Sequence, residues 1–510
     1  MYLAIELLLL SAQILVHNSG LDFKTPIEEI QFSSITSLVP SGKKSGVTYY
    51  VSPMGNDNNR GTRDRPWKTV NFAVSDRSGV KAGDTILVQP GTYTEIITLG
   101  KSGNSQLGHI TLKANGKVTL RDPDSLVGGF REGVIQSAGK GYWVIDGFRV
   151  ENSSWAGIAL RDANNMIVKN NHTYETGASG IIIMPDNYFD GGEKEITSRN
   201  IKVLNNTVER ANWRWQGKGD DNGTQEALSI WGVDGFEVAY NTLKEGKREG
   251  IDAKTGSRNG SIHHNSVTGQ AQISGTPGGY NGGPAIYVDG NRVASYNIDI
   301  YNNVVYGNTA DGIAIGDEVP KIGDVHNIRV YNNVVYNNGR QGINAGCGIC
   351  VSSNVRNVEI VHNTFVNNVQ AIIIDGSDYT GGYQPVNILV RNNIFAHSTY
   401  RNGFIQNVNN LIVDSNLFTD TFAKFYESGS GIKNLKAKDN KTVKSVGFVN
   451  LERNDFRLTS TSPAINAASW FVGQYGRLDK NGVRRNQGGK PDLGAYEYLR
   501  PGKENRDRTK

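Results

Sequence analysis

Cysteine, net charge and long apolar runs are all scarce in this sequence, and each scarcity excludes a class of protein. The 510 residues include only two cysteines, too few for a disulfide framework or a four-cysteine zinc site. The 54 Lys and Arg residues nearly balance 49 Asp and Glu residues, for a net charge of +5, which argues against a dedicated nucleic-acid-binding face. Beyond the amino-terminal segment, no run approaches the ~18 apolar residues of a membrane span. We therefore expect no nucleic-acid partner and no transmembrane span.

The first 20 residues are the one segment with a long apolar stretch. It runs from Leu3 to Val16, carries Glu6 inside, and has neither a positive leader nor a clear small-residue cleavage site. Residues 1–20 are therefore read either as a degraded signal peptide or as a cap on the domain that follows. At the other end, residues 499–510 are rich in charge and are expected to form a frayed tail.

A short repeat dominates the sequence between these ends. The phrase apolar–x–apolar–x–Asn–Asn–x–apolar, or a close variant, returns at spacings of 23 to 38 residues. Stacked coils would bring such asparagines into line about 4.8 Å apart, so that their amides can hydrogen-bond along the stack. The aligned asparagines are Asn171, Asn206, Asn241, Asn265, Asn303, Asn333, Asn363, Asn393 and Asn416.

A second phrase, Gly or Ala followed by apolar–x–apolar, precedes most copies of the first, as in GIALRDA at 157 and AIIIDGS at 371. Period-two alternation in such short runs indicates half-buried strands. Short strands, Gly and Asn corners and a fixed period predict an all-β solenoid. We predict one right-handed parallel β-helix over residues 46–498, with an N-terminal cap and flanking loops.

The domain opens on TYYVSPMGNDNNRGTRDRPWKT, residues 48–69, and continues with GDTILVQPGTY, residues 83–93. This opening resembles that of secreted β-helix carbohydrate-active proteins of the pectate-lyase-like superfamily. The resemblance implies a first strand, a capping helix near residues 68–78 and entry into the first coil. It also implies a secreted or cell-surface protein with a polysaccharide partner, which we expect to be a monomer. The matching residues are Tyr50, Ser52, Gly55, Asp57, Gly61, Thr62, Pro66, Gly83, Asp84, Pro90, Gly91 and Tyr93.

Three consecutive copies of the second phrase carry ionisable or aromatic side chains at outward positions, where most copies carry unreactive ones. Neighbouring coils would place them in columns about 4.8 Å apart, close enough for carboxylates and an amine to act on one sugar ring. The candidate catalytic residues are Glu226, Glu249, Asp252, Lys254, Tyr287 and Asp289, with Trp231 in the column of Lys254.

Two long insertions, residues 208–225 and 268–283, flank these coils and are expected to wall a groove. Trp213 and Trp215 of the first insertion, together with Trp231 and Arg161, are candidates for substrate binding. We expect Trp231 to be exposed as a platform for a sugar ring. Asp220 and Asp221 at the tip of the first insertion are candidate ligands for a cation.

The segment REGIDAKTG, residues 248–256, resembles a coil of polysaccharide lyase family 9. That family cleaves uronate-containing chains with a lysine base and with calcium held by an aspartate cluster. The resemblance implies calcium as a possible cofactor and puts Glu249 where a calcium-binding aspartate stands. The following coil has Asp289 alone in place of the cluster.

Four functions remain open for this constellation. The first is a polysaccharide lyase, with Lys254 as the base if its pKa is lowered by burial, or as the partner of the substrate carboxylate if Asp252 and Asp289 keep it charged. If Lys254 stays charged and pairs with the substrate carboxylate, Tyr287 or a histidine becomes the base. The alternatives are a glycoside hydrolase with paired carboxylates, a uronate epimerase, and a β-helix that binds glycans without catalysis.

The two cysteines, Cys347 and Cys350, are three residues apart on a predicted strand. Residues at that spacing point to opposite faces of a regular strand. The spacing therefore predicts neither a disulfide nor a metal-binding pair here.

Overall fold

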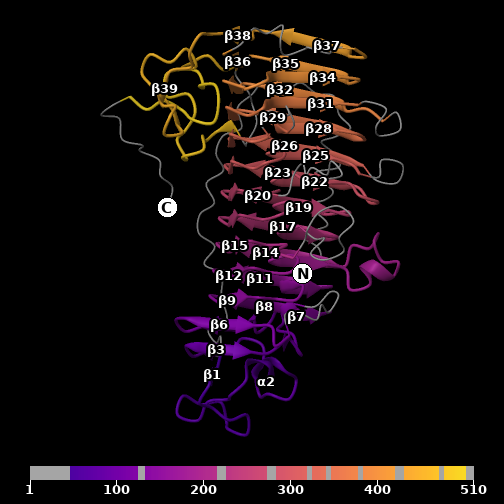
Figure 1. Ribbon diagram of the computed structural model, residues 1–510, viewed down its shortest axis with the longest axis vertical. Helices are drawn as coiled ribbons and strands as arrows, with labels where there is room; N and C mark the ends of the chain where they lie inside the picture. The colour runs from indigo at the N-terminus through magenta and orange to yellow at the C-terminus, as the bar shows by residue number, and fades with distance from the viewer. Residues whose placement is uncertain are drawn as a thin grey trace, which may run out of the picture. The chain divides into compact units, whose positions relative to one another are not determined.

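The protein is described here from a computed structural model that covers residues 46–124, 133–214, 226–272, 283–318, 324–340, 346–376, 383–419, 430–469 and 476–500. Parallel strands stack as successive coils, each coil giving one strand to each of three sheets (Figure 1). We name them sheet 1, sheet 2 and sheet 3 in the order in which the chain visits them within a coil. The predicted parallel β-helix is confirmed.

Sheet 1 holds the strands of the second sequence phrase. It consists of β4 Ile97–Thr98, β7 Gly133–Ala138, β10 Ala156–Arg161, β13 Ile181–Met184, β16 Leu228–Trp231, β19 Ile251–Lys254, β22 Ile286–Asp289, β25 Ile313–Gly316, β28 Cys347–Ser352, β31 Gln370–Asp375 and β34 Arg401–Gln406.

Sheet 2 precedes the asparagine repeat in each coil. It consists of β1 Thr48–Val51, β2 Thr85–Val88, β5 Ile110–Ala114, β8 Gly141–Asp146, β11 Asn164–Lys169, β14 Ser198–Leu204, β17 Val233–Ala239, β20 Arg258–His263, β23 Ser295–Tyr301, β26 Val325–Tyr331, β29 Val355–Val361, β32 Val386–Arg391, β35 Asn409–Asp414 and β37 Lys433–Lys438.

Sheet 3 follows the repeat with short strands. It consists of β3 Gly91–Thr94, β6 Val118–Arg121, β9 Arg149–Glu151, β12 His172–Tyr174, β15 Thr207–Glu209, β18 Thr242–Lys244, β21 Ser266–Thr268, β24 Val304–Tyr306, β27 Val334–Tyr336, β30 Thr364–Val366, β33 Ile394–Ala396, β36 Leu417–Phe418 and β38 Lys441–Thr442. Outside the coils, β39 Phe448–Asn450 and β40 Asp455–Leu458 form an antiparallel pair.

The amino-terminal end of the coil stack is covered by a short helix, α2 Val70–Val74, within the predicted range. Thr69 caps it, because its hydroxyl oxygen accepts a hydrogen bond from the backbone N–H of Phe72 at 3.2 Å. Val70, Ala73 and Val74 are buried against the first coils. Tyr49 stacks on Trp67 beneath this cap, with ring centroids 4.9 Å apart. The opening segment therefore forms the first strand and the capping helix that the resemblance implies.

An internal ladder of asparagine amides joins the coils at the turn between sheets 2 and 3. In each rung, as at Asn206, the side-chain amide donates to a main-chain carbonyl, Val168 O at 2.9 Å, and to the next amide oxygen, Asn241 Oδ1 at 3.0 Å. The residue before each rung adopts a positive φ, as Asn205 does at 54°, a conformation that asparagine tolerates better than most residues. The ladder contains all nine predicted asparagines and continues to Asn440.

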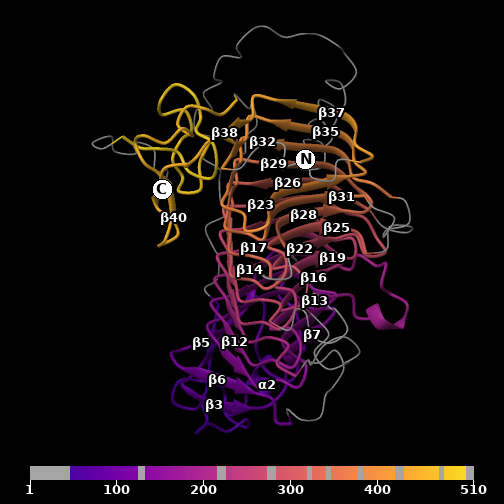
Figure 2. The ribbon, with the colours of Figure 1, turned by 45° about the horizontal axis from the view of Figure 1, so that its top comes forward.

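The carboxyl-terminal segment, described over residues 443–469 and 476–498, lies along one side of the upper coils (Figure 2). Its apolar residues, including Phe456 and Leu493, are buried in one cluster with Tyr336 and Ile394 of sheet 3. The buried guanidinium of Arg485 donates to Asn332 Oδ1 at 2.7 Å, which fixes the segment to a coil turn. The carboxyl-terminal segment therefore covers sheet 3 at the upper coils.

Residues 1–45 and 501–510 lie outside the described residues, and with them the amino-terminal segment 1–20 and most of the predicted tail. In the described part of the chain, no helix has both the length and the apolar character needed to span a bilayer. The expectation of a monomer stays a prediction.

Candidate functional site

The candidate site is built on three neighbouring strands of sheet 1, β16, β19 and β22. Their register pairs Ser229 with Asp252, and Trp231 with Lys254. The next pairing sets Asp252 beside Tyr287. These columns are the ones that the sequence repeat predicts. Apolar neighbours such as Ile251 and Ala253 fill the interior of the coil, so the alternating residues face the outer side of the sheet.

The centre of the site is an ion-paired lysine. Lys254 Nζ lies 2.5 Å from Glu226 Oε1 and 3.3 Å from Asp252 Oδ2. The second oxygen of Glu226 accepts a hydrogen bond from Ser229 Oγ at 2.9 Å. Lys254 Nζ also lies 4.6 Å from the ring centroid of Trp231, within range of a cation–π contact. All three charged side chains are buried, Lys254 being 8% exposed.

Burial and pairing decide which of these groups carry charge. Burial disfavours the ammonium of Lys254, but the surrounding carboxylates, led by Glu226 and Asp252, outweigh it and raise the pKa of Lys254 well above its ordinary value. Burial likewise opposes ionisation of Glu226, yet Lys254 and Arg248 together hold the pKa of Glu226 below its usual range. Lys254 is therefore an ammonium and Glu226 a carboxylate. Of the two roles expected for Lys254, this favours the charged partner over the base.

The remaining predicted acids are shifted the other way. Burial is the largest effect at Asp252, Asp289 and Glu249, and it raises the pKa of each carboxyl group. Burial also raises the pKa of Tyr287 well above that of a free phenol. The site thus combines one stabilised carboxylate with carboxyl groups that favour the protonated form. Environments that push apart the pKa values of neighbouring acids are typical of acid–base sites.

A surface groove of about 400 Å³ opens over this cluster. We call it the lysine groove. Charged side chains of both signs and aromatic rings share its surface, a composition suited to a sugar chain. Its lining residues are Tyr188, Phe189, Glu193, Glu226, Trp231, Arg248, Lys254, Asn291, Arg292 and Glu318.

Trp231 lines the groove but is not the exposed platform that the sequence predicts. Its side chain is only 2% exposed, because η1 Tyr188–Asp190 folds aromatic residues over it. The ring centroids of Tyr188 and Trp231 are 4.6 Å apart, and Phe189 completes the cluster. The exposure prediction is wrong, and Tyr188 and Phe189 line the groove together with Trp231.

Four of the predicted catalytic residues lie behind the groove surface, not on it. Asp252 supports Lys254, and Glu249 pairs with Arg248, whose Nε lies 3.1 Å from Glu249 Oε2. Asp289 Oδ1 accepts from the backbone N–H groups of Asn291 and Glu318, both at 3.1 Å. The fourth, Tyr287, is not among the lining residues either.

The other predicted binding residues lie away from the lysine groove or outside the described chain. Arg161 pairs with Asp186 at 3.1 Å. Trp213 is 43% exposed and lies beneath the guanidinium of Arg210. Neither residue lines the groove. Trp215, Asp220 and Asp221 lie outside the described residues, as do parts of both insertions that were expected to form walls.

The groove does not form a calcium site from its described side chains. Calcium requires six to eight oxygen ligands, whereas the position between Glu226 and Asp252 is filled by the ammonium of Lys254. In the part of the chain that the structure describes, His, Cys, Asp and Glu side chains bring three ligand atoms within 4.8 Å only at Asp311, Cys347 and Cys350. Glu249, which the resemblance implies as a calcium ligand, forms an ion pair with Arg248 instead.

Several groove residues were missed by sequence reasoning because they stand just outside the repeat phrases. Tyr188 and Phe189 come from the η1 loop, and Arg292 from the turn after β22. Arg292 Nη1 donates to the hydroxyl of Tyr188 at 3.0 Å. The DGNR turn that follows Asp289 was the available signal, because it adds a cation directly beside the predicted column.

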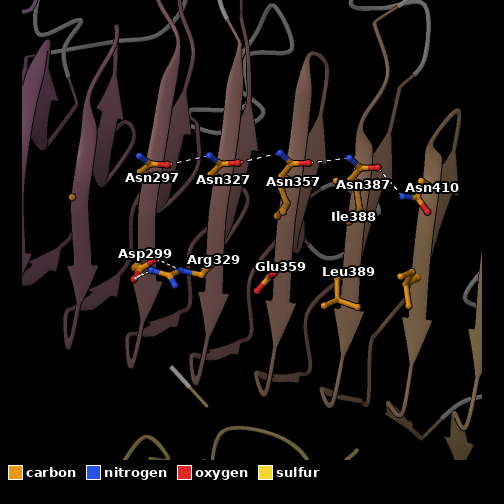
Figure 3. Close-up of a pocket in the computed structure, with 13 residues that line it drawn as sticks. Asn297, Asp299, Asn327, Arg329, Asn357, Glu359, Asn387, Ile388, Leu389 and Asn410 are labelled. Atoms are coloured by element: carbon orange, nitrogen blue, oxygen red, sulfur yellow. Dashed lines mark hydrogen bonds and ion pairs between the residues drawn. The ribbon is translucent and has the colours of Figure 1, made fainter. Parts of the chain in front are cut away.

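A second, larger groove of about 630 Å³ lies on sheet 2 (Figure 3). One edge is an exposed amide ladder that runs through Asn297, Asn327 and Asn357. Asp299 and Arg329 form a bidentate ion pair beside it. This surface contains none of the predicted catalytic residues, so the lysine groove on sheet 1 remains the candidate active site.

Comparison with known proteins agrees with the fold. Residues 49–211 match the family described as "Pel9A-like, right handed beta helix region". The predicted resemblance and handedness are confirmed. The match ends before Glu226 and therefore bears on the scaffold and not on the chemistry of the lysine groove.

Two curated proteins are similar to this chain in sequence over part of its length, and one crystal structure is similar over most of it. "Uncharacterized protein YwoF" of Bacillus subtilis is 27% identical over 292 residues, 52% of this chain and 57% of that protein. "Pectate lyase PEL9" of Emericella nidulans is 28% identical over 163 residues, 27% of this chain and 38% of that protein. The chain thus matches about half or less of each curated relative. The crystal structure of pectate lyase Pel9A covers 89% of this chain and 98% of its own, with 19% identity and a TM-score of 0.48.

Proposed function

We propose that the lysine groove binds a uronate-containing polysaccharide and cleaves it by β-elimination. The observation that carries this proposal is the ammonium of Lys254, which is held charged by Glu226 and Asp252 on the floor of an aromatic-lined groove. The similarity to a protein named pectate lyase PEL9 supports the same class of substrate. We expect the protein to act where such polysaccharides occur, outside the cell.

The first requirement of β-elimination is to neutralise the substrate carboxylate, which makes the neighbouring C5 proton more acidic. Lys254 provides a fixed positive charge at the groove surface. Arg292 provides a second one, and both line the same groove. A planar guanidinium can bind a carboxylate through two parallel hydrogen bonds. We infer that the uronate carboxylate binds between these two cations.

The second requirement is a base for the C5 proton, and Glu226 is the ionised carboxylate nearest to Lys254. In the free protein Lys254 lowers the basicity of Glu226. A substrate carboxylate that draws the ammonium toward itself weakens this pairing. Because Glu226 is buried, its pKa then rises. Substrate binding would thus convert Glu226 from an ion-pair partner into a base.

The third requirement is an acid for the leaving oxygen at C4. Tyr188 lines the groove, and burial raises its pKa, although Lys254 and Arg292 oppose the shift. Its hydroxyl therefore keeps its proton at neutral pH. In the proposed step Glu226 takes the C5 proton, the electron pair forms the C4–C5 double bond, and Tyr188 protonates O4 as the C4–O4 bond breaks.

One observation favours a glycoside hydrolase as the second candidate. Glu226 and Asp252 share Lys254 Nζ at 2.5 and 3.3 Å. This brings the two carboxyl groups close to the ~5–5.5 Å separation of retaining glycosidases and below the ~6.5–9.5 Å of inverting ones. Glu226, which lines the groove, would be the nucleophile. Asp252, whose pKa burial raises, would be the acid once substrate binding moves Lys254 and opens Asp252 to the groove.

The product distinguishes these functions. The full chain is incubated with polygalacturonate, with alginate and with a neutral glucan, and both reducing ends and ultraviolet absorbance are followed. Unsaturated, absorbing ends from an acidic glycan support the lyase, whereas reducing ends without absorbance support the hydrolase. Inversion at C5 without cleavage would indicate the epimerase. If no glycan is changed, the proposal of catalysis fails and glycan binding without catalysis becomes the leading function.

A further inference from the structure

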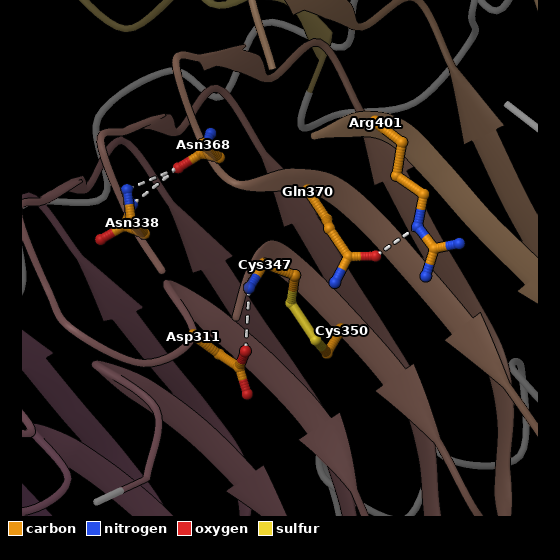
Figure 4. Close-up of a disulfide and its surroundings, with 7 residues drawn as sticks. All are labelled: Asp311, Asn338, Cys347, Cys350, Asn368, Gln370 and Arg401. Carbon is orange, nitrogen blue, oxygen red and sulfur yellow. Dashed lines mark hydrogen bonds between the residues drawn. A yellow bond between two sulfur atoms is a disulfide. The ribbon is translucent and has the colours of Figure 1, made fainter. Parts of the chain in front are cut away.

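Cys347 and Cys350 form a disulfide next to the carboxyl group of Asp311, on the strands that follow β22 along sheet 1 (Figure 4). The sequence-based prediction of no disulfide is wrong. A regular strand would separate such residues by about 10 Å, but their Cα atoms are 6.2 Å apart. Both cysteines lie on β28, whose register with β31 pairs Cys347 with Gln370 and Ile349 with Ile372 but skips Gly348. The strand is therefore irregular between the two cysteines.

Asp311 is fixed toward the two sulfur atoms. Its Oδ1 accepts a hydrogen bond from the backbone N–H of Cys347 at 2.9 Å. The two sulfurs and one carboxylate oxygen all lie within 4.8 Å of one another. Cys347 is fully buried, whereas Asp311 and Cys350 are partly exposed. The cluster therefore has one wall in the protein core and one side open to solvent.

We propose that reduction of the disulfide converts Asp311, Cys347 and Cys350 into a binding site for a thiophilic divalent cation, with zinc as the expected ion. Two thiolates and a carboxylate are ligands that zinc accepts, and a water molecule would complete a tetrahedron from the open side. Zinc–sulfur bonds of ~2.3 Å set the two sulfurs roughly 3.8 Å apart in a tetrahedral site. Separate thiolates can reach that spacing by rotation of the two cysteine side chains.

The surroundings suit a cation once the sulfur atoms are thiolates. Gln370 is the register partner of Cys347 on the next strand. Its amide oxygen accepts from Arg401 Nε at 2.6 Å (Figure 4). The guanidinium of Arg401 is thus bound to Gln370, which lies between Arg401 and the two cysteines.

The chemistry has two balanced steps. A phosphine or dithiol reductant supplies two electrons, the sulfur–sulfur bond breaks, and two protons from water give two thiols while the reductant is oxidised. Zinc then binds the two sulfurs and releases both thiol protons. The oxidised chain lacks thiolates, so it should not bind zinc at this position.

The test uses the full chain, reduced with a phosphine, freed of reductant and titrated with zinc against a coloured chelator. We expect one tightly bound zinc per reduced chain and none per oxidised chain. Cobalt should give thiolate-to-metal absorbance with the reduced chain only. Cys350→Ser should abolish tight binding, and Asp311→Asn should weaken it at least tenfold. Asp375→Asn on the neighbouring strand β31 is the matched control and should bind like the wild type.

A second measurement does not depend on the folding of a variant. Zinc should protect both thiols of the reduced wild-type chain from alkylation, which is counted by mass spectrometry. The proposal is overturned if the reduced chain binds no zinc, if the oxidised chain binds as tightly, or if both thiols are alkylated at the same rate with and without zinc.

Discussion

Replacing Lys254 with methionine tests whether a buried ion pair organises the lysine groove. The change removes the cation 2.5 Å from Glu226 while keeping most of the side-chain volume. With an effective dielectric constant of ~20, Coulomb's law gives about 7 kcal/mol of attraction at that distance. The desolvation cost of the ammonium offsets part of it, and breaking one partner of such a pair costs about 3–5 kcal/mol. We expect a loss of free energy of unfolding in that range near pH 7.

The loss should depend on pH with a defined sign. In the wild type, Lys254 and Arg248 outweigh burial and lower the pKa of Glu226, so this group stabilises the fold above its unfolded pKa and loses that effect as the pH falls through the folded value. In Lys254→Met, burial dominates and raises the pKa of Glu226. The variant therefore loses stability as the pH rises through that raised value. The difference between wild type and variant should be smallest in acid and largest at neutral pH.

Equilibrium unfolding in urea, followed by tryptophan fluorescence at pH 4, 5.5 and 7, measures this difference. Lys202→Met is the matched control, because Lys202 forms a 2.8 Å ion pair with Glu237 at the surface. An exposed pair of this kind contributes about 0–1 kcal/mol. If Lys254→Met costs no more than Lys202→Met, or costs the same at every pH, the buried ion pair does not organise the site.

Three further predictions concern the ladder, the groove and the carboxyl-terminal segment. Asn303→Ala removes four hydrogen bonds of a buried side chain and should cost about 3 kcal/mol or more by calorimetry. Asn327→Ala on the exposed ladder should cost about 1 kcal/mol. Equal costs would contradict the role of the internal ladder. Tyr188→Phe should reduce kcat at least tenfold with little change in KM, and an unchanged kcat would exclude Tyr188 as the acid. Burial raises the pKa of Glu497 to about 7, so the stability that Glu497 gives to the carboxyl-terminal segment is complete in acid and falls as the pH rises through that value. Amide hydrogen exchange, corrected for its intrinsic pH dependence, should show that this segment loses protection first above pH 7. Unchanged protection would contradict this prediction.

The coil stack could be predicted from the sequence because each coil repeats the same local solution. The residue before each rung adopts a positive φ, so Asn is frequent there, although Tyr240, His264, His362 and Ser415 also occupy this position. The next residue must satisfy buried backbone groups, so an asparagine recurs at every rung. The same repeat fixed the strand register, which is why Trp231 and Lys254 were correctly placed in one column. Local rules of this kind are readable without knowledge of distant contacts.

The exposure of side chains could not be predicted in the same way, because it depends on segments that do not repeat. Trp231 is outward-facing on its strand and still buried, since the η1 loop folds over it. The charge of Lys254 depends on how burial balances against several carboxylates, which requires their distances. The disulfide between Cys347 and Cys350 depends on an irregularity of β28 at Gly348, which a regular-strand rule does not contain.

The most direct test of the central claim compares Glu226→Gln with Glu237→Gln on an acidic polysaccharide that the wild type cleaves. Glu226 is only 2% exposed beneath the lysine groove, whereas Glu237 lies on sheet 2 and pairs with Lys202 at the surface. Circular dichroism first establishes that both variants keep the β-helix. We expect Glu226→Gln to lose at least a hundredfold in the initial rate of unsaturated-end formation and Glu237→Gln to match the wild type. Equal rates for wild type and Glu226→Gln would contradict the assignment of the lysine groove as the active site.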